Sequence, residues 1–337
     1  MRAPVFWDKG GWQADALAPA AWLWRAAGWL RAKAATPARA PLPVICIGNV
    51  TVGGAGKTPT ALACLGLIAE RHGADFAHAV TRGYGGGLPG PVRVDPERHT
   101  AAEVGDEALL LARSAPTWVA RDRVAGAQAA AVAGAKLVVL DDGLQNPTIA
   151  KDLSLLVVDG GAGFGNGRMM PAGPLREPVT AALGRADAII VVGDDTYGVA
   201  ARVRAGRSDL PILAARLEPD PAAANGLKGA RVVAFAGIGR PGKFFATLAA
   251  CGAEIVGERS FPDHHRFTAA DLAALFGAAE RASARLVTTE KDWVRLDGAA
   301  RERVTALPVS LATDRAALAR LLEPILARAA APEAVRA

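Results

Sequence analysis

A glycine-rich loop between a predicted strand and a predicted helix constrains this chain more than any other stretch. The loop, residues 51–58, reads Thr-Val-Gly-Gly-Ala-Gly-Lys-Thr; the apolar run 43–47 precedes it and a helix-like run over 61–70 follows it. This order is typical of a phosphate-binding loop, because glycines lack a Cβ and let backbone N–H groups converge on phosphate oxygens. The sequence therefore predicts that a nucleotide binds against Thr51, Val52, Gly53, Gly54, Ala55, Gly56, Lys57 and Thr58.

Two side chains of this loop carry the expected chemistry. Lys57 can reach the β- and γ-phosphates of ATP, and the Thr58 hydroxyl can ligate Mg²⁺. The usual pattern is G-x-x-x-x-G-K-[ST], and its first position is Thr51 here. The lysine, the glycine before it and the hydroxyl after it are intact, so a phosphate site is favoured over an ordinary glycine-rich turn.

An acidic pair follows a second apolar run. Residues 137–140, Leu-Val-Val-Leu, predict a buried parallel strand, and Asp141 and Asp142 come directly after it. Ligands bind at the carboxyl edge of an open α/β sheet, where a carboxylate can hold Mg²⁺ directly or through water. Asp141 is the first candidate for the metal, and Asp142 could serve the metal or position the nucleotide. A simple acidic turn is the alternative.

Two loops carry further charges that could face a ligand. Residues 81–87 follow a strand predicted over 75–80 and contain Arg82 and Tyr84, which indicates either a substrate loop or a plain turn. Residues 160–178 form a long loop rich in glycine and proline, and a loop of this length is usually functional or disordered. The side chains that it could present to a ligand are Arg168, Arg176 and Glu177.

Two polar stretches have competing interpretations. Asp106 precedes a helix predicted over 108–113, and its position alone favours a helix N-cap over a catalytic role. His264 and His265 are adjacent, which suggests a metal, but no H-x-x-x-H or C-x-x-C partners lie nearby. The alternative for the histidines is a surface turn that ends at an N-cap, Thr268.

A second series of alternating strands and helices begins near residue 231. Residues 237–242 have the form G-x-G-x-x-G after a strand predicted over 232–236. A dinucleotide site, a structural turn and a domain-closing or substrate loop are all open, and Pro241 weakens the first because it removes an amide donor. Residues 219–229, rich in proline and glycine, are the predicted linker between two domains.

The N-terminal segment differs from the rest of the chain. Residues 1–41 contain six basic and two acidic residues and so carry +4 of the formal net charge of +6, and five of the seven tryptophans lie in residues 1–40. A helix predicted over 14–35 is interrupted by Arg25 and is too short in apolar length to span a bilayer. Tryptophan with arginine and lysine suits a helix lying in the headgroup layer, and packing on protein is the alternative.

The remaining composition excludes several classes. The net positive charge is concentrated at one end of the chain, and there is no stacking motif for nucleic acid, so no nucleic-acid partner is expected. Cys46, Cys64 and Cys251 form no C-x-x-C pair, which indicates reduced thiols rather than a disulfide framework or a zinc site.

Taken together and in this order, the motifs resemble the tetraacyldisaccharide 4′-kinase family, which acts in lipid A biosynthesis in Gram-negative bacteria. The resemblance covers nearly the whole chain, and a threonine at the position of Thr51 is normal for that family. The stretches that carry the resemblance are residues 48–59, 82–85, 104–107, 140–145, 171–177, 263–265 and 288–293.

The resemblance implies an activity and a fold. ATP, with Mg²⁺, would phosphorylate the 4′-hydroxyl of a tetraacylated disaccharide 1-phosphate to give lipid IVA, at the cytoplasmic face of the bacterial inner membrane and without an obligate protein partner. The implied fold is a P-loop NTPase-type α/β/α sandwich with a second, smaller α/β domain and an N-terminal interfacial helix. The expected boundaries are residues 1–40 for the helix, 41–220 for the kinase domain and 230–328 for the smaller domain.

The resemblance also assigns roles to particular residues. Asp106 becomes the base that accepts the sugar hydroxyl proton, assisted by His264, with His265 as the second choice. Arg176 is expected near the transferring phosphate and Glu177 near the metal, beside Thr58. The residues expected to contact the substrate are Arg82, Tyr84, Gln145 and Arg168.

Two other classes of function compete with a kinase. A dimerising P-loop NTPase that regulates or assembles a partner would explain Lys57 and Asp141, but it gives no task to Asp106 or to the N-terminal tryptophans. A non-catalytic membrane-binding module would need no Mg²⁺ carboxylates. Two domains that flank a phosphate site further predict a hinge closure that excludes water.

Overall fold

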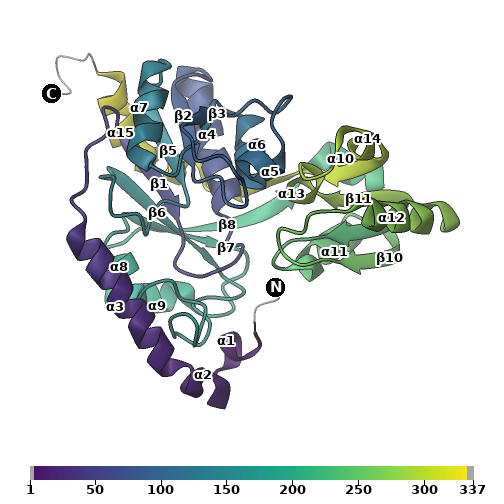
Figure 1. Cartoon of the computed structure of the whole chain (residues 1–337), viewed down its shortest axis with the longest axis horizontal. Helices are drawn as coiled ribbons and strands as arrows, with labels where there is room; N and C mark the ends of the chain where they lie inside the picture. Colours follow the sequence, from purple (N-terminus) through teal and green to yellow (C-terminus); the bar gives the residue numbers. More distant parts are fainter. Residues whose placement is uncertain (1–3, 332–337) are drawn as a thin grey trace.

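The computed structural model describes residues 4–331, and the strands in this range form two separate sheets (Figure 1). The larger sheet contains β1 (Val44–Gly48), β2 (Ala77–Thr81), β3 (Val92–Arg93), β4 (Thr117–Val119), β5 (Leu137–Asp141), β6 (Leu153–Asp159), β7 (Ala188–Val192), β8 (Ile212–Pro219) and β13 (Val309–Thr313). Their order across the sheet is β13-β8-β7-β6-β1-β5-β2-β4-β3. Only the pairings of the edge strands β13 and β3 are antiparallel among the described pairs.

The central strands of this sheet are buried on both faces, as their continuous apolar runs predict. Ile45 and Ile47 of β1 enter one core with α4 (Lys57–His72) and α15 (Arg315–Ala330). Val44 and Cys46 enter the opposite core. The helices of that second face are α7 (Arg123–Val132), α8 (Val179–Leu183) and α9 (Val199–Gly206). The predicted α/β/α sandwich is therefore confirmed.

The smaller sheet is parallel throughout the described strands and is also covered on both faces. Its strands, in spatial order, are β10 (Glu254–Ser260), β9 (Arg231–Ala236), β11 (Arg285–Thr289) and β12 (Val304–Leu307). One face packs on α10 (Pro221–Leu227) and α11 (Pro241–Ala250), and the other on α12 (Ala269–Arg281) and α14 (Gly298–Arg303). The short helices α5 (Ala101–Val104), α6 (Asp106–Ala112) and α13 (Glu290–Trp293) lie where the two sheets meet (Figure 1).

The chain passes from the larger to the smaller sheet between the end of β8 at Pro219 and the start of β9 at Arg231, where the linker was predicted. This stretch is helical, however: the Asp220 side chain accepts a hydrogen bond from the Ala223 amide, and with Pro221 in the first turn it starts α10. Residues 309–328, in contrast to the prediction, pack with the larger sheet. β13 pairs with β8, and one face of α15 fills the core of the larger sheet, because its apolar residues cover strands that would otherwise face water.

The N-terminal segment forms α1 (Phe6–Lys9), α2 (Trp12–Ala16) and α3 (Ala18–Ala34). Figure 1 shows α3 as a rod along the outer side of the larger sheet, beside α8 and α9. Ala21 is the one buried residue of α3, and the large side chains of Trp22, Leu23, Trp29 and Leu30 are each more than half exposed. No helix within residues 4–331 has both the length and the apolar character that crossing a membrane requires.

Gly48 connects β1 to the phosphate loop, and its lack of a side chain can be tested. A Cβ at Gly48 would lie 2.4 Å from the Leu144 Cβ, whereas a Cβ at Gly66 in α4 would meet nothing within 4 Å. We expect Gly48→Ala to lower the free energy of unfolding by about 1–3 kcal/mol through overpacking. The control Gly66→Ala should raise it by up to about 1 kcal/mol, since alanine favours the helix. Urea denaturation measures both, and equal effects of the two substitutions would contradict this account.

Candidate active site

The phosphate loop lies at the carboxyl end of β1 and leads directly into α4. Gly56 precedes the helix with a φ of 93°, a left-handed conformation that favours glycine. Asn49, fully buried beneath the loop, donates a hydrogen bond of 2.7 Å from Nδ2 to the Thr51 carbonyl and accepts one of 3.3 Å at Oδ1 from Lys57 Nζ. The loop is therefore shaped by contacts within the chain, with its helix N-terminus aimed at the position of an anion.

Asp142 gathers two cations beside this loop. Its carboxylate accepts hydrogen bonds of 2.8 and 3.0 Å from Arg176 Nη1 and lies 3.7 Å from Lys57 Nζ. Burial raises the pKa of the Asp142 carboxyl, but the charges of Lys57 and Arg176 outweigh this and hold the pKa below its ordinary value. Asp142 has a φ of 57°, which turns it away from the strand and out toward these cations.

Asp141 lies in a very different environment. It is fully buried at the end of β5, its Oδ2 accepts a hydrogen bond of 3.0 Å from the Thr58 hydroxyl, and its Oδ1 has no hydrogen-bond partner among the described residues. Burial, reinforced by the nearby charge of Glu107, raises the pKa of Asp141 to about 7. A buried carboxylate oxygen without a partner, next to a threonine hydroxyl, fits the ligand set of a divalent cation.

Asp106 is the first residue of α6, but its side chain does not cap that helix. Gly105 occupies the N-cap position, and Asp106 Oδ2 lies 3.1 Å from His264 Nδ1 and 2.8 Å from Arg295 Nε. Arg295 Nη2 donates to the same oxygen. Interpreting Asp106 from its position alone as an N-cap is therefore wrong, and the pairing of Asp106 with His264 that the resemblance implied is present in the structure. His265 instead contacts Asp271.

The charge of Asp106 is compensated from the smaller sheet. Burial raises the pKa of its carboxyl, but the hydrogen bond from His264 and the charges of Lys291 and Arg295 outweigh it and hold the pKa far below the ordinary value. Glu107, the next residue of α6, accepts a hydrogen bond of 3.0 Å from Lys291 Nζ. Two neighbouring acids of the larger sheet are thus neutralised by side chains that follow β10 and β11.

The loop of residues 237–242, which follows β9 of the smaller sheet, lies against residues of the larger sheet's domain. Asp159, at the end of β6, pairs with Arg240 at 2.7 Å and with Lys243 at 2.9 Å. A Cβ on Gly239 would lie 3.8 Å from the Gly54 amide of the phosphate loop. The Gly237 amide already donates to Asp292. Of the three interpretations of this G-x-G-x-x-G stretch, these contacts favour a domain-closing loop over a dinucleotide cradle.

The four residues expected to contact the substrate lie in three different places in the structure. Arg82 and Tyr84 are exposed after β2, and the Tyr84 ring makes an edge contact with His264 at 5.1 Å between centroids. Gln145 instead donates to the Asn49 carbonyl and to Glu177, so it supports the phosphate loop from behind. Arg168 pairs with Asp15 of α2.

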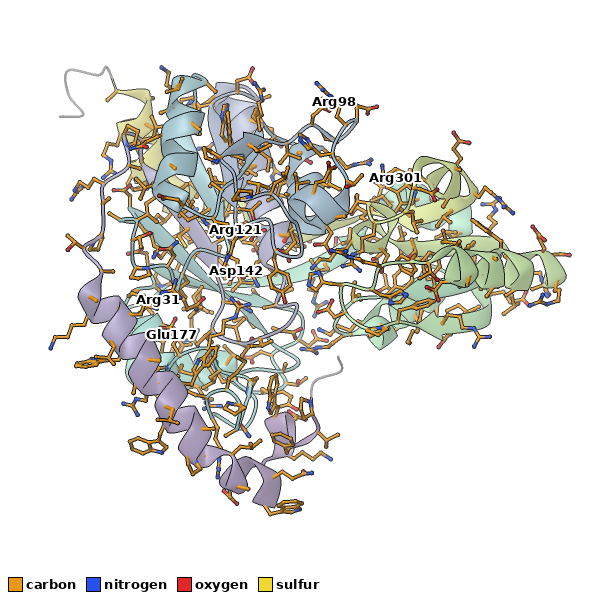
Figure 2. The ribbon with its side chains drawn as sticks, in the orientation of Figure 1. Arg31, Arg98, Arg121, Asp142, Glu177 and Arg301 are labelled. Carbon is orange, nitrogen blue, oxygen red and sulfur yellow. The ribbon has the colours of Figure 1, made fainter. Side chains whose placement is uncertain are left out.

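Glu177 does not join Asp141 and Thr58 in the described contacts. Its carboxylate accepts a hydrogen bond of 2.9 Å from Gln145 and forms an ion pair with Arg185, which lies between α8 and β7. In Figure 2 Glu177 is labelled close to α3, away from Asp142. The structure therefore does not support the expectation that Glu177 binds the metal, because its charge is already neutralised.

The N-terminal segment contacts the same long loop that supplies Arg176. Trp7 Nε1 donates to the Pro171 carbonyl at 2.9 Å, and Trp24 Nε1 donates to the Arg176 carbonyl at 3.2 Å. The loop in turn pairs with the phosphate loop, since the Val52 amide donates to Pro174 and the Arg176 amide donates to Val50. A continuous set of contacts therefore links α1–α3 to the phosphate loop.

Sequence reasoning gave no role to several residues of this site. Arg295, Lys291 and Asp159 form ion pairs with residues of the other sheet's domain, and no local sequence pattern predicts such partners. Asn49 lies within the glycine-rich stretch, and its complete burial was the missing information. Only the strand-end position of Asp159, which matches that of Asp141, offered a signal.

Comparisons with known proteins identify a family and a solved structure that this chain resembles. A family model described as "LpxK: Tetraacyldisaccharide-1-P 4'-kinase" matches residues 13–327. A tetraacyldisaccharide 4′-kinase of Rhodospirillum centenum is 58% identical over 332 residues, which cover 97% of each chain. One of Methylobacterium sp. (strain 4-46) is 55% identical and covers 95% of this chain and 96% of that protein. A crystal structure of LpxK from Aquifex aeolicus in complex with ATP matches with a TM-score of 0.73 at 26% identity, over 93% of this chain and 99% of that one.

The opposite environments of Asp141 and Asp142 predict opposite pH dependences. From about pH 4 to 7 the folded protein binds a proton at Asp141 more tightly than the unfolded chain, so this group lowers stability as the pH rises. Asp141→Asn should therefore gain stability over the parent protein between pH 5 and pH 8, measured by denaturant unfolding in EDTA.

The adjacent residue supplies the control for this measurement. Asp142 has a lowered pKa, so it stabilises the fold above its ordinary pKa and loses this contribution as the pH falls through the lowered value. Asp142→Asn should be less stable than the parent at pH 8, with a deficit that shrinks in strong acid. Changes of the same sign in both variants at pH 8 would show that the two environments are not as different as described.

Proposed function

The chain belongs to the tetraacyldisaccharide-1-P 4′-kinase family and is a kinase that uses ATP to phosphorylate the 4′-hydroxyl of a tetraacyldisaccharide 1-phosphate in lipid A biosynthesis; we propose that it does so between its two sheets. The observation that carries this proposal is the convergence of three groups. The phosphate loop, the buried Asp141 and the pair of Asp106 with His264 come from different elements and meet at the carboxyl edge of the larger sheet.

The phosphates of ATP would occupy the phosphate loop. Backbone N–H groups of residues 53–58 and the N-terminus of α4 face them. Lys57 and Arg176 now share Asp142, and both would turn to the β- and γ-phosphates because these carry more negative charge than one carboxylate. Asp142 thus keeps both cations at the site before the nucleotide arrives and positions them afterwards.

Mg²⁺ fits the residues present. Thr58 Oγ1 and the unpartnered oxygen of Asp141 are the proposed ligands, and Asp142 is close enough in sequence to act through water. A bound Mg²⁺ would neutralise charge on the phosphates during transfer. The chain's own contribution is to bury Asp141 and so keep a carboxylate oxygen free of competing donors.

The pair of Asp106 and His264 would manage the proton of the sugar hydroxyl. An ionised carboxylate has no hydrogen to give, so the imidazole donates from Nδ1 to Asp106, which orients the ring. The acceptor hydroxyl would lie beside this pair, next to exposed Tyr84 and Arg82, and in line with the γ-phosphate. Because phosphoryl transfer demands little from a base, positioning by this pair matters more than its basicity.

The N-terminal helices would lie on the membrane surface that holds the lipid substrate. Trp22, Leu23, Trp29 and Leu30 expose apolar surface on α3, and the guanidinium of Arg25 and the ammonium of Lys33 lie over two of these rings at 5.9 and 4.8 Å. Aromatic rings with flanking cations suit the headgroup layer. These side chains support binding to a membrane surface, and the resemblance to the family makes the cytoplasmic face of the inner membrane the proposed one.

Activity assays separate the roles of Lys57 and Asp106. With Mg-ATP and disaccharide 1-phosphate in detergent, mass spectrometry should detect the doubly phosphorylated lipid. Lys57→Ala should lower kcat/KM by about 10³-fold through lost charge stabilisation. Asp106→Ala should lower kcat by about 10²–10³-fold and leave ATP binding intact. Loss of nucleotide binding in Asp106→Ala, with the fold retained, would sink its assignment to the proton.

The same assay distinguishes a kinase from a regulatory NTPase. A kinase should turn over little ATP without the acceptor and much more with it. A dimerising switch protein would respond to a protein partner instead, and acceptor lipid would leave its ATP turnover unchanged.

Vesicle flotation tests the membrane surface. Replacing Trp22, Leu23, Trp29 and Leu30 together by serine should reduce binding to anionic phospholipid vesicles at least about tenfold, since each buried apolar side chain contributes about 1.5–3 kcal/mol. Val132→Ser in α7 is the control, because Val132 is 91% exposed on another helix. Undiminished flotation of the fourfold variant would mean that α3 does not bind the membrane.

A further inference from the structure

The Arg295 side chain donates four hydrogen bonds inside the candidate active site, to Asp106, Gly237 and Asp292. Its side chain is 5% exposed and follows α13 in the smaller sheet's domain. Nε and Nη2 both donate to Asp106 Oδ2, while Nη1 donates to the Gly237 carbonyl at 2.7 Å and to Asp292 Oδ1 at 2.8 Å. One guanidinium therefore spans the carboxylate of the larger sheet and two anchors of the smaller one.

We propose that Arg295 is a positioning residue for phosphoryl transfer, which holds Asp106 in one orientation and in the ionised state. The proposal rests on the proposed function, because it takes the pair of Asp106 and His264 as the group that manages the acceptor proton. Arg295 itself would not touch the substrate or the phosphates. It would act through Asp106.

The geometry assigns different tasks to the two oxygens of Asp106. Oδ2 faces three N–H groups, two from Arg295 and one from His264, so its lone pairs are engaged. Oδ1 accepts one hydrogen bond, of 2.9 Å, from the Glu107 amide and retains acceptor capacity. Arg295 thereby selects Oδ1 as the oxygen that can face an incoming hydroxyl.

The two residues of the smaller domain that Arg295 contacts are themselves buried and hydrogen-bonded. Asp292 is fully buried and accepts hydrogen bonds from the Thr289 hydroxyl at 2.7 Å and from the Gly237 amide at 3.0 Å. The His264 amide donates to the Gly237 carbonyl, which also accepts from Arg295. Both partners of Asp106 are thus fixed to the same backbone carbonyl, so the orientation of the carboxylate and that of the imidazole depend on one another.

The charges around Asp106 explain why a fork-shaped cation is needed. The groups that face it are the cations Arg295 and Lys291, the imidazole of His264, and the carboxylates of Glu107 and Asp292. Without Arg295, Asp106 and Asp292 would face each other with less compensation, and the pKa of Asp106 would rise. A lysine could restore the charge but not the planar set of donors.

The test compares Arg295→Met and Arg295→Lys in the full-length protein, with Arg303→Met as the control. Arg303 is an exposed arginine of the same domain that pairs with Glu280 and lies over Phe276. Kinase activity is measured from pH 5 to 9 with saturating ATP and acceptor, and ATP binding and thermal unfolding are measured alongside. Arg303→Met should match the parent protein in all of these.

Arg295→Met should lower kcat by about 10²-fold, with ATP affinity unchanged, because the base loses its orientation. In the parent protein the Asp106 pKa lies far below the measured pH range, so Asp106 should produce no acid limb there. In Arg295→Met the carboxylate loses a cation while it stays buried, so an acid limb should enter the measured range. Arg295→Lys should move this acid limb back toward lower pH while kcat stays low. A purely structural role would lower the unfolding temperature without moving the pH profile.

A double-mutant cycle makes the test independent of folding defects in one variant. In an Asp106→Asn background, Arg295→Met should reduce kcat no further, because Arg295 acts through Asp106. If Asp106→Asn is inactive while Arg295→Met keeps the parent's kcat and shows no acid limb in the measured range, the role of Arg295 is refuted and the proposed function stands. If Asp106→Asn is itself fully active, the proposed function of the pair fails first. An additive loss in the double variant would also overturn the proposal.

Discussion

A buried carboxylate in one sheet, neutralised by cations from the other, is the interaction on which the rest of this structure depends. Asp106 is 3% exposed, and Arg295, Lys291 and His264 all reach it from the smaller sheet's domain. Removing such a charge from water costs several kcal/mol, and leaving it without its partners costs about 3–5 kcal/mol. The larger sheet therefore cannot bury Asp106 unless the smaller sheet is docked. Docking of the sheets and assembly of the pair of Asp106 with His264 are consequently a single event. The ion pairs of Asp159 with Arg240 and Lys243 add further contacts between the two sheets' domains.

A second set of contacts ties the phosphate loop to the N-terminal helices. The segment that contains Arg176 hydrogen-bonds to the backbone of Val50 and Val52 on one side and receives the indole N–H of Trp24 on the other. The side chain of Arg176 meanwhile neutralises Asp142, which Figure 2 places in the middle of the larger-sheet domain. The helix that exposes apolar side chains is thus hydrogen-bonded to the backbone of Arg176, the residue proposed to face the phosphates. A disturbance of α3 would reach the phosphate site through three hydrogen bonds.

The parts of this site that could be predicted are those with a local signature. The phosphate loop and Asp141 follow from a strand, a turn and the residues at its end. Continuous apolar runs predicted the buried strands, whereas the sandwich was implied by the resemblance to a family. Asp106 could not be identified in this way, since an acid before a helix is more often a cap, and only the resemblance to a family assigned its role. Arg295 contacts Asp106 across 189 residues of sequence, and Lys243 contacts Asp159 across 84. Such pairings are set by how two sheets dock, which no window of sequence contains. The pairing of β13 with β8 in the larger sheet could not be predicted for the same reason, because the sequence of a short strand does not show which strand it pairs with.

The allocation of charges explains how the site can receive a nucleotide without losing its own order. Lys291 and Arg295 are paired with Glu107 and Asp106, and the pair of Arg295 with Asp106 is buried between the sheets, with side chains 5% and 3% exposed. Lys57 and Arg176 are held by Asp142, which is about a quarter exposed and can release them. Among the described residues the Asp141 carboxylate receives a hydrogen bond only from the Thr58 hydroxyl, so it is the carboxylate that would gain most from a divalent cation. On nucleotide binding, Lys57 and Arg176 would therefore move from Asp142 to the phosphates, and the metal would bind at Asp141. The ion pairs around Asp106 would stay intact. Nucleotide binding and acceptor activation can in this way use adjacent carboxylates without competing for the same cations.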